Sequence, residues 1–255
     1  MKPTKHSKNS WEHLVAQVEG GFDFSFAFQP IVNAQTREVV SFEALVRGPN
    51  GEPSREIFSK LDDCNRYRFD QACRVKAIYW ASRLKLDHNL NINLFPNAMV
   101  QTGMSIKTTL EASLEYGFPT SKIVFEVTED ERVDHPDRLI HVIRTYDELG
   151  FRTAIDDFGV GYSGLYLLQE YQPDFIKLDR RLISHVQENS IKQTIVKGIV
   201  FICRELGIEI MAEGVETVRE YEWLFQAGIN YFQGYYFARP AFEALPEVIE
   251  NRYYI

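Results

Sequence analysis

Short apolar runs alternate with amphipathic stretches along most of the chain. The apolar runs have the length of β-strands, and the stretches between them repeat apolar residues at helical spacing. Candidate strands lie at 24–28, 39–45, 90–94, 123–127, 153–155, 175–178, 209–212 and 231–232. Eight strands alternating with helices in a chain of 255 residues predict an α/β fold of the TIM type, a (β/α)8 barrel.

Turn and capping residues mark the ends of several helices. A helix is predicted over 191–206, where Gly207 is placed to end it. Two further helices are expected to begin at Pro136 and after Thr217, the second at a Thr-x-x-Glu capping box. A long helical region is also predicted between Arg55 and Leu86.

The first connection between strands is too short to hold a helix. About ten residues separate Phe28 from Val39, whereas a crossover between parallel strands takes a dozen or more. A connection of this length makes an antiparallel hairpin. We therefore expect a barrel with an antiparallel first strand.

The same alternation also fits a doubly wound open sheet. The barrel is favoured because polar strand ends come from many strands, and only a closed ring brings so many carboxyl ends to one mouth. No Pro/Gly/Ser-rich linker or charge block divides the chain. One barrel domain over 21–255 is expected, preceded by a short flexible leader at 1–20.

Composition narrows the class of partner and the compartment. The formal net charge of −8 argues against a nucleic-acid polymer, which needs a basic stripe. No apolar stretch reaches the length of a membrane span, and the first ten residues lack the apolar core of a secretory signal. The three cysteines are too few for a disulfide scaffold and are expected to be reduced thiols in a cytoplasmic protein.

Six of the apolar runs end in a carboxylate or carboxamide. Charges at the ends of buried strands are costly to desolvate unless something compensates them, so the series indicates a shared cation site. None of the six histidines lies at a predicted strand end, and an all-oxygen set selects Mg²⁺ or Mn²⁺ over zinc. The candidate metal ligands are Glu43, Asn93, Glu126, Asp156, Asp157 and Glu213. Because five carboxylates exceed the charge of one divalent ion, two ions are expected, the arrangement that activates water for phosphoester cleavage.

Asp156 and Asp157 are the most informative pair. Adjacent side chains of a continuing strand point to opposite faces, so both reach one metal site only where the strand bends. The following segment, 158–161, contains two glycines and allows such a bend. The alternative is that Asp157 only caps a helix that starts near Ser163.

Three charged residues near these acids have a functional and a structural interpretation. Lys177 could lower the pKa of a metal-bound water, orient that water or touch a phosphate oxygen, or it could simply form ion pairs. Glu213 could ligate metal or accept a proton from water, or it could cap a helix. The planar guanidinium of Arg47 suits a phosphate, although a surface ion pair is the commoner role for a single arginine.

Ordered blocks of residues resemble the EAL domain, the bacterial cyclic di-GMP phosphodiesterase family. The tripeptide Glu43-Ala44-Leu45 gives that family its name, and the resemblance extends from about residue 24 to Pro240. The matching blocks are 28–32, 43–47, 91–94, 125–129, 156–163, 176–180, 212–217 and 233–240.

The resemblance implies a specific reaction. EAL enzymes are (β/α)8 barrels with an antiparallel first strand that open cyclic di-GMP to linear pGpG by a two-metal, metal-activated-water mechanism. The cofactors implied are two Mg²⁺ or Mn²⁺ ions, with Ca²⁺ inhibitory. By resemblance the six candidate ligands bind the metals, Lys177 contacts the attacking water and Glu213 is the proposed general base. Glu129 corresponds to the glutamate that orders the loop after Asp157.

The resemblance also assigns residues around the metals. The expected substrate-side residues are Gln29, Glu43, Leu45, Arg47, Gln233 and Pro240, with Gln233 close to the metals and their water. Asp179 and Glu216 are expected to support the site from behind its ligands. The family further implies a homodimer formed through helices near the Asp157 loop.

The chain departs from the family pattern in three places. The segment 48–53 is shorter than usual and lacks a Trp-x-His-Pro stretch, Val160 stands in place of a threonine, and Phe95 in place of a serine. None of these changes removes a metal ligand or Lys177, so an active enzyme is predicted. The alternatives are a catalytically silent EAL-like cyclic di-GMP receptor or protein-interaction module, and another Mg²⁺-dependent barrel enzyme.

Overall fold

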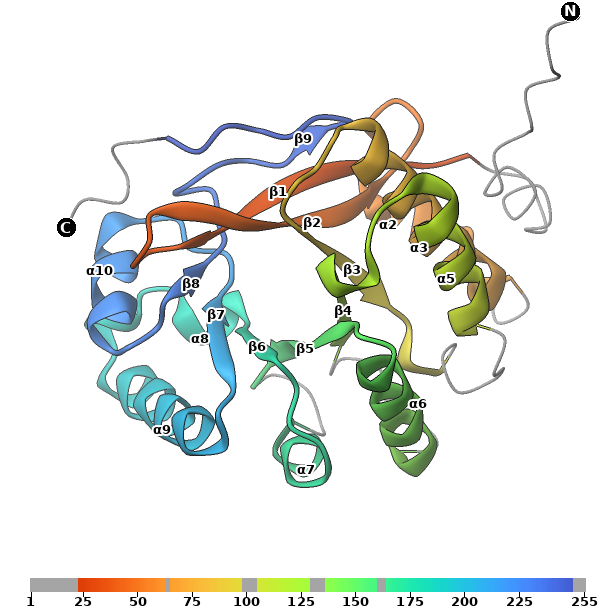
Figure 1. Ribbon diagram of the computed structural model, residues 1–255. Coiled ribbons are helices and arrows are strands. Elements are labelled where there is room, and N and C mark those ends of the chain that lie inside the picture. Colours follow the sequence, from red (N-terminus) through yellow and green to blue (C-terminus); the bar gives the residue numbers. More distant parts are fainter. Residues whose placement is uncertain (1–22, 63–64, 98–104, 129–135, 160–163, 250–255) are drawn as a thin grey trace, which may run out of the picture.

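The strands close into a ring, with the helices outside it (Figure 1). The computed structural model describes residues 23–62, 65–97, 105–128, 136–159 and 164–249. The strands are β1 (Ser25–Asn33), β2 (Glu38–Arg47), β3 (Asn89–Leu94), β4 (Ile123–Thr128), β5 (Arg152–Phe158), β6 (Phe175–Leu178), β7 (Glu209–Ala212), β8 (Tyr231–Phe232) and β9 (Ala241–Phe242). The expected leader at 1–20 lies outside the described residues.

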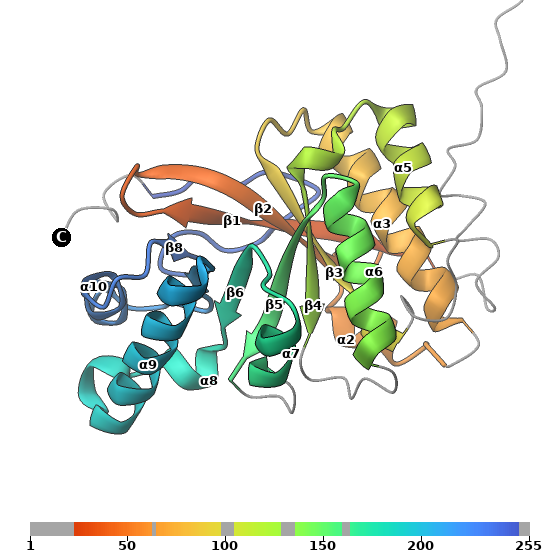
Figure 2. The ribbon, with the colours of Figure 1, turned by 60° about the horizontal axis from the view of Figure 1, so that its bottom comes forward.

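The helices follow the strands along the chain and cover the outer face of the ring (Figure 2). They are α2 (Ser54–Phe58), α3 (Arg66–Arg83), α5 (Ser105–Tyr116), α6 (Pro136–Glu148), α7 (Gly164–Glu170), α8 (Arg180–Ile183), α9 (Ser190–Leu206) and α10 (Val218–Gln226). Of the described helices, none is long and apolar enough to cross a membrane.

Strand pairing confirms the predicted barrel and excludes the open sheet. From β2 to β8 each strand pairs in parallel with the next. β1 pairs antiparallel with both β2 and β8 and so closes the ring. The short β9, which the sequence did not predict, adds to β1 at Ala27 and Phe28.

Asn33 builds the turn of the β1–β2 hairpin. Its side-chain oxygen accepts hydrogen bonds from the backbone N–H groups of Gln35 and Thr36, at 2.8 and 3.2 Å. Arg37 follows in the left-handed region, with φ 61°. Because β1 runs against its neighbours, this turn lies at the end of the barrel away from the carboxyl ends of β2–β8 and leaves that mouth open.

The long helical region predicted between Arg55 and Leu86 consists of two helices, α2 and α3. Asp62 and Asn65, between them, exchange hydrogen bonds in which each side chain accepts from the other's backbone N–H (3.0 and 2.9 Å). Local side-chain bonds of this kind compete with the helical backbone pattern and end the helix.

Helix caps elsewhere agree with the sequence. Asn189 caps α9 and Gly207 ends it in the left-handed conformation, with φ 72°. Both hydrogen bonds of the capping box between Thr217 and Glu220 are present at the start of α10.

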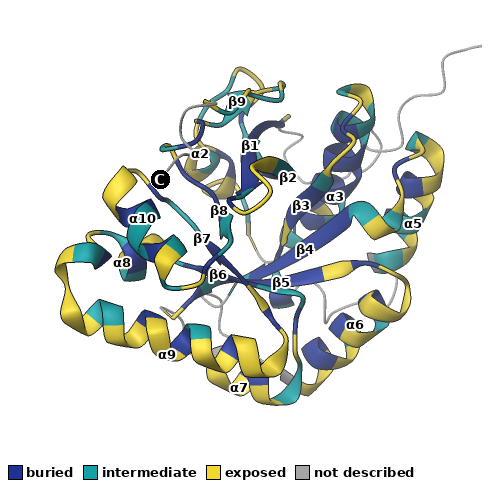
Figure 3. Ribbon diagram, turned by 60° about the vertical axis from the view of Figure 1, so that its left-hand side comes forward, coloured by how far each residue is buried: buried dark blue, intermediate teal, exposed yellow. Residues whose placement is uncertain are grey.

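The strands separate an apolar outer layer from a polar interior. In β3, Leu90 and Ile92 belong to the buried core between ring and helices, whereas Asn91 and Asn93 turn inward, because successive strand residues point to opposite faces. Buried strands and exposed outer helix faces are distinguished in Figure 3. Among the described cysteines, Cys73 and Cys203 are buried free thiols.

Candidate active site

Lys177 lies at the centre of the mouth formed by the carboxyl ends of the strands. Its side chain is 0% exposed, and its ammonium group contacts one oxygen from each of four acids. The distances from Nζ are 2.9 Å to Glu126 Oε2, 3.0 Å to Asp156 Oδ1, 3.2 Å to Glu213 Oε2 and 3.3 Å to Glu43 Oε2. Lys177 therefore forms the ion pairs that one interpretation of the sequence expected.

Glu43 is held on both of its oxygens. Asn93 Nδ2 donates to Oε1 at 2.7 Å, and Gln233 Nε2 donates to Oε2 at 2.7 Å. These contacts join strands β2, β3 and the residue after β8 at one depth in the barrel. The structure thus brings the predicted ligands Glu43 and Asn93 together.

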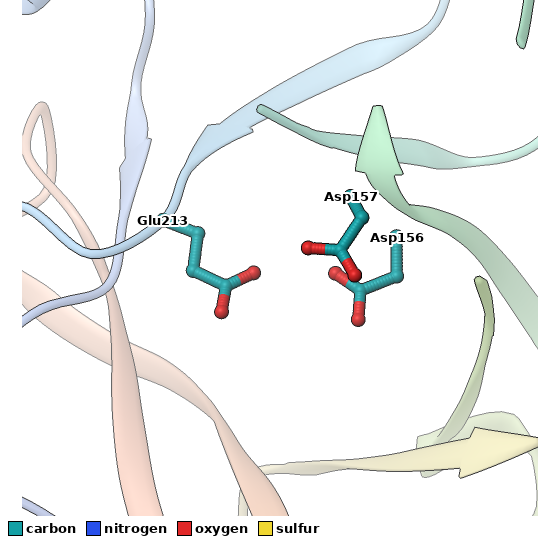
Figure 4. A group of neighbouring side chains, drawn as sticks. All are labelled: Asp156, Asp157 and Glu213. Carbon is teal, nitrogen blue, oxygen red and sulfur yellow. The ribbon is translucent and has the colours of Figure 1, made fainter. Parts of the chain in front are cut away.

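The expected bend in β5 is present, and it falls at Asp157 itself. Asp157 has a left-handed backbone with φ 55°, a conformation that aspartate tolerates better than most residues. The pairing of β5 with β6 shifts register between Ile155 and Phe158. Asp156 and Asp157 therefore both turn toward Glu213 across the mouth (Figure 4).

The negative charge of the acids at the mouth exceeds the single positive charge of Lys177. Burial raises the pKa of Glu126 well above its usual range, and repulsion from Glu43 adds to the rise. Burial also raises the pKa of Glu213 to about 8, outweighing the attraction of Lys177. The mouth therefore resists holding all of its carboxyl groups ionised without a further cation.

Lys177 and Glu43 stay charged in this setting. Burial works against the Lys177 ammonium, but Asp156 and the other acids raise its pKa well above the usual range. Burial likewise raises the pKa of Glu43, but Lys177, with hydrogen bonds from Gln233 and Asn93, lowers it further, so the net shift is downward. These two groups form the fixed ion pair of the site.

The oxygens at the mouth fit a divalent cation. Ligand oxygens of Asp156, Asp157 and Glu213 all lie within 4.8 Å of one another. Asp156 Oδ1 and Glu213 Oε2 are buried, and both contact the Lys177 ammonium, at 3.0 and 3.2 Å. Carboxylate oxygens with spare lone pairs are the ligands that hard cations take.

The expected substrate-side residues lie beside this cluster. Gln29 donates to the Ala238 carbonyl at 3.0 Å, and its Oε1 lies 3.4 Å from Gln233 Nε2. Pro240 directly precedes β9, which pairs with β1 next to Gln29. These contacts form a wall on the β1 side of the mouth.

Arg47 and Leu45 come from the end of β2, close to the metal-binding candidates. Arg47 Nη1 donates to the Val46 carbonyl at 2.8 Å. The guanidinium forms no ion pair with an acid within the described ranges, so the surface ion pair considered from the sequence is not observed there. Leu45 is half-buried on the same strand.

The two residues expected to support the site contact its ligands' neighbours. Asp179 caps α8 by accepting from Arg181 N at 2.7 Å, and its carboxyl group neighbours that of Asp157. Glu216 binds Arg180 at 2.7 Å, and Arg180 in turn donates to the carbonyl of Gly214, directly after Glu213. Glu129 and Val160 lie outside the described residues.

Sequence reasoning missed Asn91 and Ser41. Asn91 Nδ2 donates to Glu126 Oε1 at 2.7 Å, and the Ser41 hydroxyl donates to Asn91 Oδ1. Both residues are buried inside the barrel, one layer below the strand ends. The signal that finds them is the period of two: each precedes a predicted ligand, Asn93 or Glu43, by two positions on the same face.

Comparisons with a family model and with known proteins point to the same family. A family model described as the EAL domain matches residues 12–240. The chain is 34% identical over 224 residues to the blue light- and temperature-regulated antirepressor BluF of Escherichia coli, covering 88% of this chain and 56% of that protein. It is 31% identical to the cyclic di-GMP phosphodiesterase PdeR of Escherichia coli, covering 85% of this chain and 33% of that protein. The chain thus spans about half or less of these curated relatives.

Two solved structures share the fold closely. A standalone versatile EAL protein from Vibrio cholerae O395, in its c-di-GMP-bound form, is 47% identical with a TM-score of 0.88, covering 92% of this chain and 99% of that one. A manganese/cy-diGMP complex of Klebsiella pneumoniae BlrP1 is 39% identical with a TM-score of 0.84, covering 91% of this chain and 59% of that one.

Proposed function

The chain belongs to the EAL domain family, and from this membership we propose that it is a phosphodiesterase that hydrolyses cyclic di-GMP to linear pGpG with two Mg²⁺ or Mn²⁺ ions. The relatives support the substrate class, since one is named a cyclic di-GMP phosphodiesterase and one was solved with manganese and the dinucleotide. The free thiols Cys73 and Cys203 support a reducing compartment, the cytoplasm.

One observation carries the proposal. Five carboxyl groups and Asn93 gather at one barrel mouth, where the Lys177 ammonium contacts four of the acids and offsets only one of their charges. A catalytically silent domain has no need to hold this many like charges together. The proposed ligands are Glu43, Asn93, Glu126, Asp156, Asp157 and Glu213.

The chain's own groups have separate tasks in the reaction. Bound divalent ions would supply positive charge to the phosphate and make the attacking water more acidic. Glu213, at the rim with a third of its side chain exposed, accepts the proton of that water. Lys177 orients the water from below. Arg47 binds a phosphate oxygen, and Gln29 and Pro240 line the dinucleotide beside it.

Product analysis tests this function. Purified protein incubated with cyclic di-GMP is expected to yield pGpG in Mg²⁺ or Mn²⁺, and none in EDTA, with Ca²⁺ inhibiting. Glu43→Ala should abolish turnover because Glu43 lies between Asn93, Gln233 and Lys177. An absence of pGpG at every protein concentration, in both ions, contradicts the proposal.

The name of BluF, an antirepressor, favours one second candidate: a silent module that binds the dinucleotide or a protein. The two candidates differ in turnover. Tight binding of cyclic di-GMP without pGpG in either ion would support the silent module.

We also propose that the chain forms a homodimer through α7 and α9, which lie side by side on the outer ring (Figures 1 and 3). Ile191, Ile195 and Ile202 lie along one side of α9 and are 71%, 45% and 37% exposed. Gly198 lies on the same line, and a Cβ there would meet nothing within 4 Å, which leaves room for another backbone. Leu165 of α7 is 66% exposed. An apolar face of this kind favours association with a second copy.

A charge on that face should separate the copies. Ile195→Glu is expected to shift the protein to monomer in analytical ultracentrifugation, because a carboxylate would be desolvated at the contact. Leu114→Glu, at a 84% exposed position on α5, is the matched control and should leave the oligomer unchanged. A wild-type chain that is monomeric at all concentrations contradicts the dimer.

A further inference from the structure

Three asparagines share the inner face of β3, because Asn89, Asn91 and Asn93 alternate with apolar residues. Asn93, at the mouth, donates to Glu43. Asn91, one layer deeper, donates to Glu126 at 2.7 Å. The same strand therefore contacts two of the proposed metal ligands at two depths.

Glu126 is fixed between two donors. Its Oε1 accepts from Asn91 and its Oε2 accepts from Lys177, at 2.7 and 2.9 Å. Glu126 is 0% exposed and Asn91 2% exposed, so these bonds are buried away from bulk solvent. Rotation of the carboxyl group would break both contacts at once.

Ser41 fixes the direction of the Asn91 amide. The hydroxyl of Ser41 lies against Asn91 Oδ1, and its other acceptor is the backbone carbonyl of Asn89 at 3.0 Å. A hydroxyl that donates to Oδ1 leaves Nδ2 facing Glu126. Two consecutive hydrogen bonds therefore run from Ser41 to Asn91 and from Asn91 to the Glu126 carboxylate.

A cavity of about 160 Å³ lies below these hydrogen bonds, toward the amino ends of the strands. Its lining includes Ser41, Asn89, Asn91 and Arg152. A cavity of this size holds water, so a truncated residue 91 could be replaced by solvent. A test of the amide must therefore keep its volume.

We propose that Asn91 is a positioning residue that holds Glu126 in the orientation required for divalent-cation binding, with Ser41 setting the direction of its amide. This inference rests on the proposed metal site. It assigns a role to a residue below the ligands, which touches neither the substrate nor the proposed ions. Loss of a hydrogen bond to a metal ligand of this kind typically weakens metal binding about 10- to 100-fold.

Calorimetric titration of the full chain with Mn²⁺, without substrate, tests the assignment. Asn91→Leu keeps the branched shape, removes the donor and admits no water, and it is expected to weaken Mn²⁺ binding about 10- to 100-fold. Asn89→Leu is the matched control on the same strand face. Among the described residues the Asn89 side chain makes no hydrogen bond, so binding by this variant should match the wild type.

Unfolding temperature in EDTA separates positioning from stability. An Asn91→Leu variant that lowers the unfolding temperature but binds Mn²⁺ like the wild type would overturn the proposal.

If Asn91→Leu does not fold, Ser41→Ala is the deciding variant. Its Mn²⁺ binding is expected to weaken about threefold to tenfold, as for one lost hydrogen bond. Unchanged binding in Ser41→Ala would then overturn it. A wild-type chain that binds no Mn²⁺ overturns the metal site as well, whereas normal wild-type binding with an unaffected Asn91→Leu overturns the Asn91 assignment alone.

Discussion

Lys177→Met is expected to lower the free energy of unfolding by about 3–5 kcal/mol in EDTA and to abolish hydrolysis of cyclic di-GMP. Methionine replaces most of the buried volume of lysine, so the loss reports on charge. Four carboxyl groups, all within 3.3 Å of the ammonium, lose their common partner. These buried acids still lose their hydration on folding, but they no longer gain an ion pair that compensates for it.

Mn²⁺ should restore part of the stability lost in Lys177→Met. In the wild type the ammonium and a cation share the same carboxylate oxygens, whereas in the variant a cation is the only compensation. The rise in unfolding temperature on adding Mn²⁺ is therefore expected to be larger for the variant than for the wild type. Lys122→Met is the matched control: its partner Asp87 is 93% exposed, and exposed pairs contribute about 0–1 kcal/mol. A change of less than about 1 kcal/mol for Lys177→Met would contradict the central role of the ammonium.

The ring and its mouth were predictable because buried charge is costly. A single acid at a strand end means little, but Glu43, Glu126, Asp156 and Glu213 must share a compensating group if their strands meet. That reasoning predicted a closed ring, and the pairing of β1 with both β2 and β8 confirms it. The length of the first connection was equally decisive, since it left room only for a hairpin.

Residues deeper in the barrel were not predictable in the same way. Asn91 and Ser41 lie inside strands, where the sequence pattern shows polar residues but no strand end. Their role depends on register: Ser41 lies beside Asn89, and Asn91 beside Val124 of the next strand, two residues before Glu126. Register across parallel strands is set by packing of the whole ring, which no single segment encodes.

Local competition explains the other differences. The predicted helical region is interrupted because the side chains of Asp62 and Asn65 bond to each other's backbone and compete with the helical pattern. β9 escaped prediction because two residues carry no periodic signal, and its pairing depends on the edge of β1. At Asp157 the sequence indicated a bend, but only the structure places the left-handed residue at the aspartate itself.

Glu213→Gln is expected to lower kcat about 10²- to 10⁴-fold, the range for loss of a general base. Glutamine keeps the length of the side chain and a ligand oxygen but does not take a proton from water. Folding should not suffer in EDTA, because the site carries excess negative charge and the Lys177 ammonium keeps three other acids as partners. The measurement is steady-state hydrolysis of cyclic di-GMP at saturating substrate.

A Mn²⁺ titration of activity separates the two proposed roles of Glu213. If Glu213 only ligates metal, high Mn²⁺ should return kcat to within about threefold of the wild type, as mass action refills the weakened site. If it also accepts the proton, kcat stays low at saturating Mn²⁺ while the Mn²⁺ concentration for half-activation rises modestly. Glu209→Gln is the matched control, the same change at the exposed far end of β7, and it should leave both quantities unchanged. Full recovery of Glu213→Gln would thus remove Glu213 as the base and leave its place among the metal ligands intact.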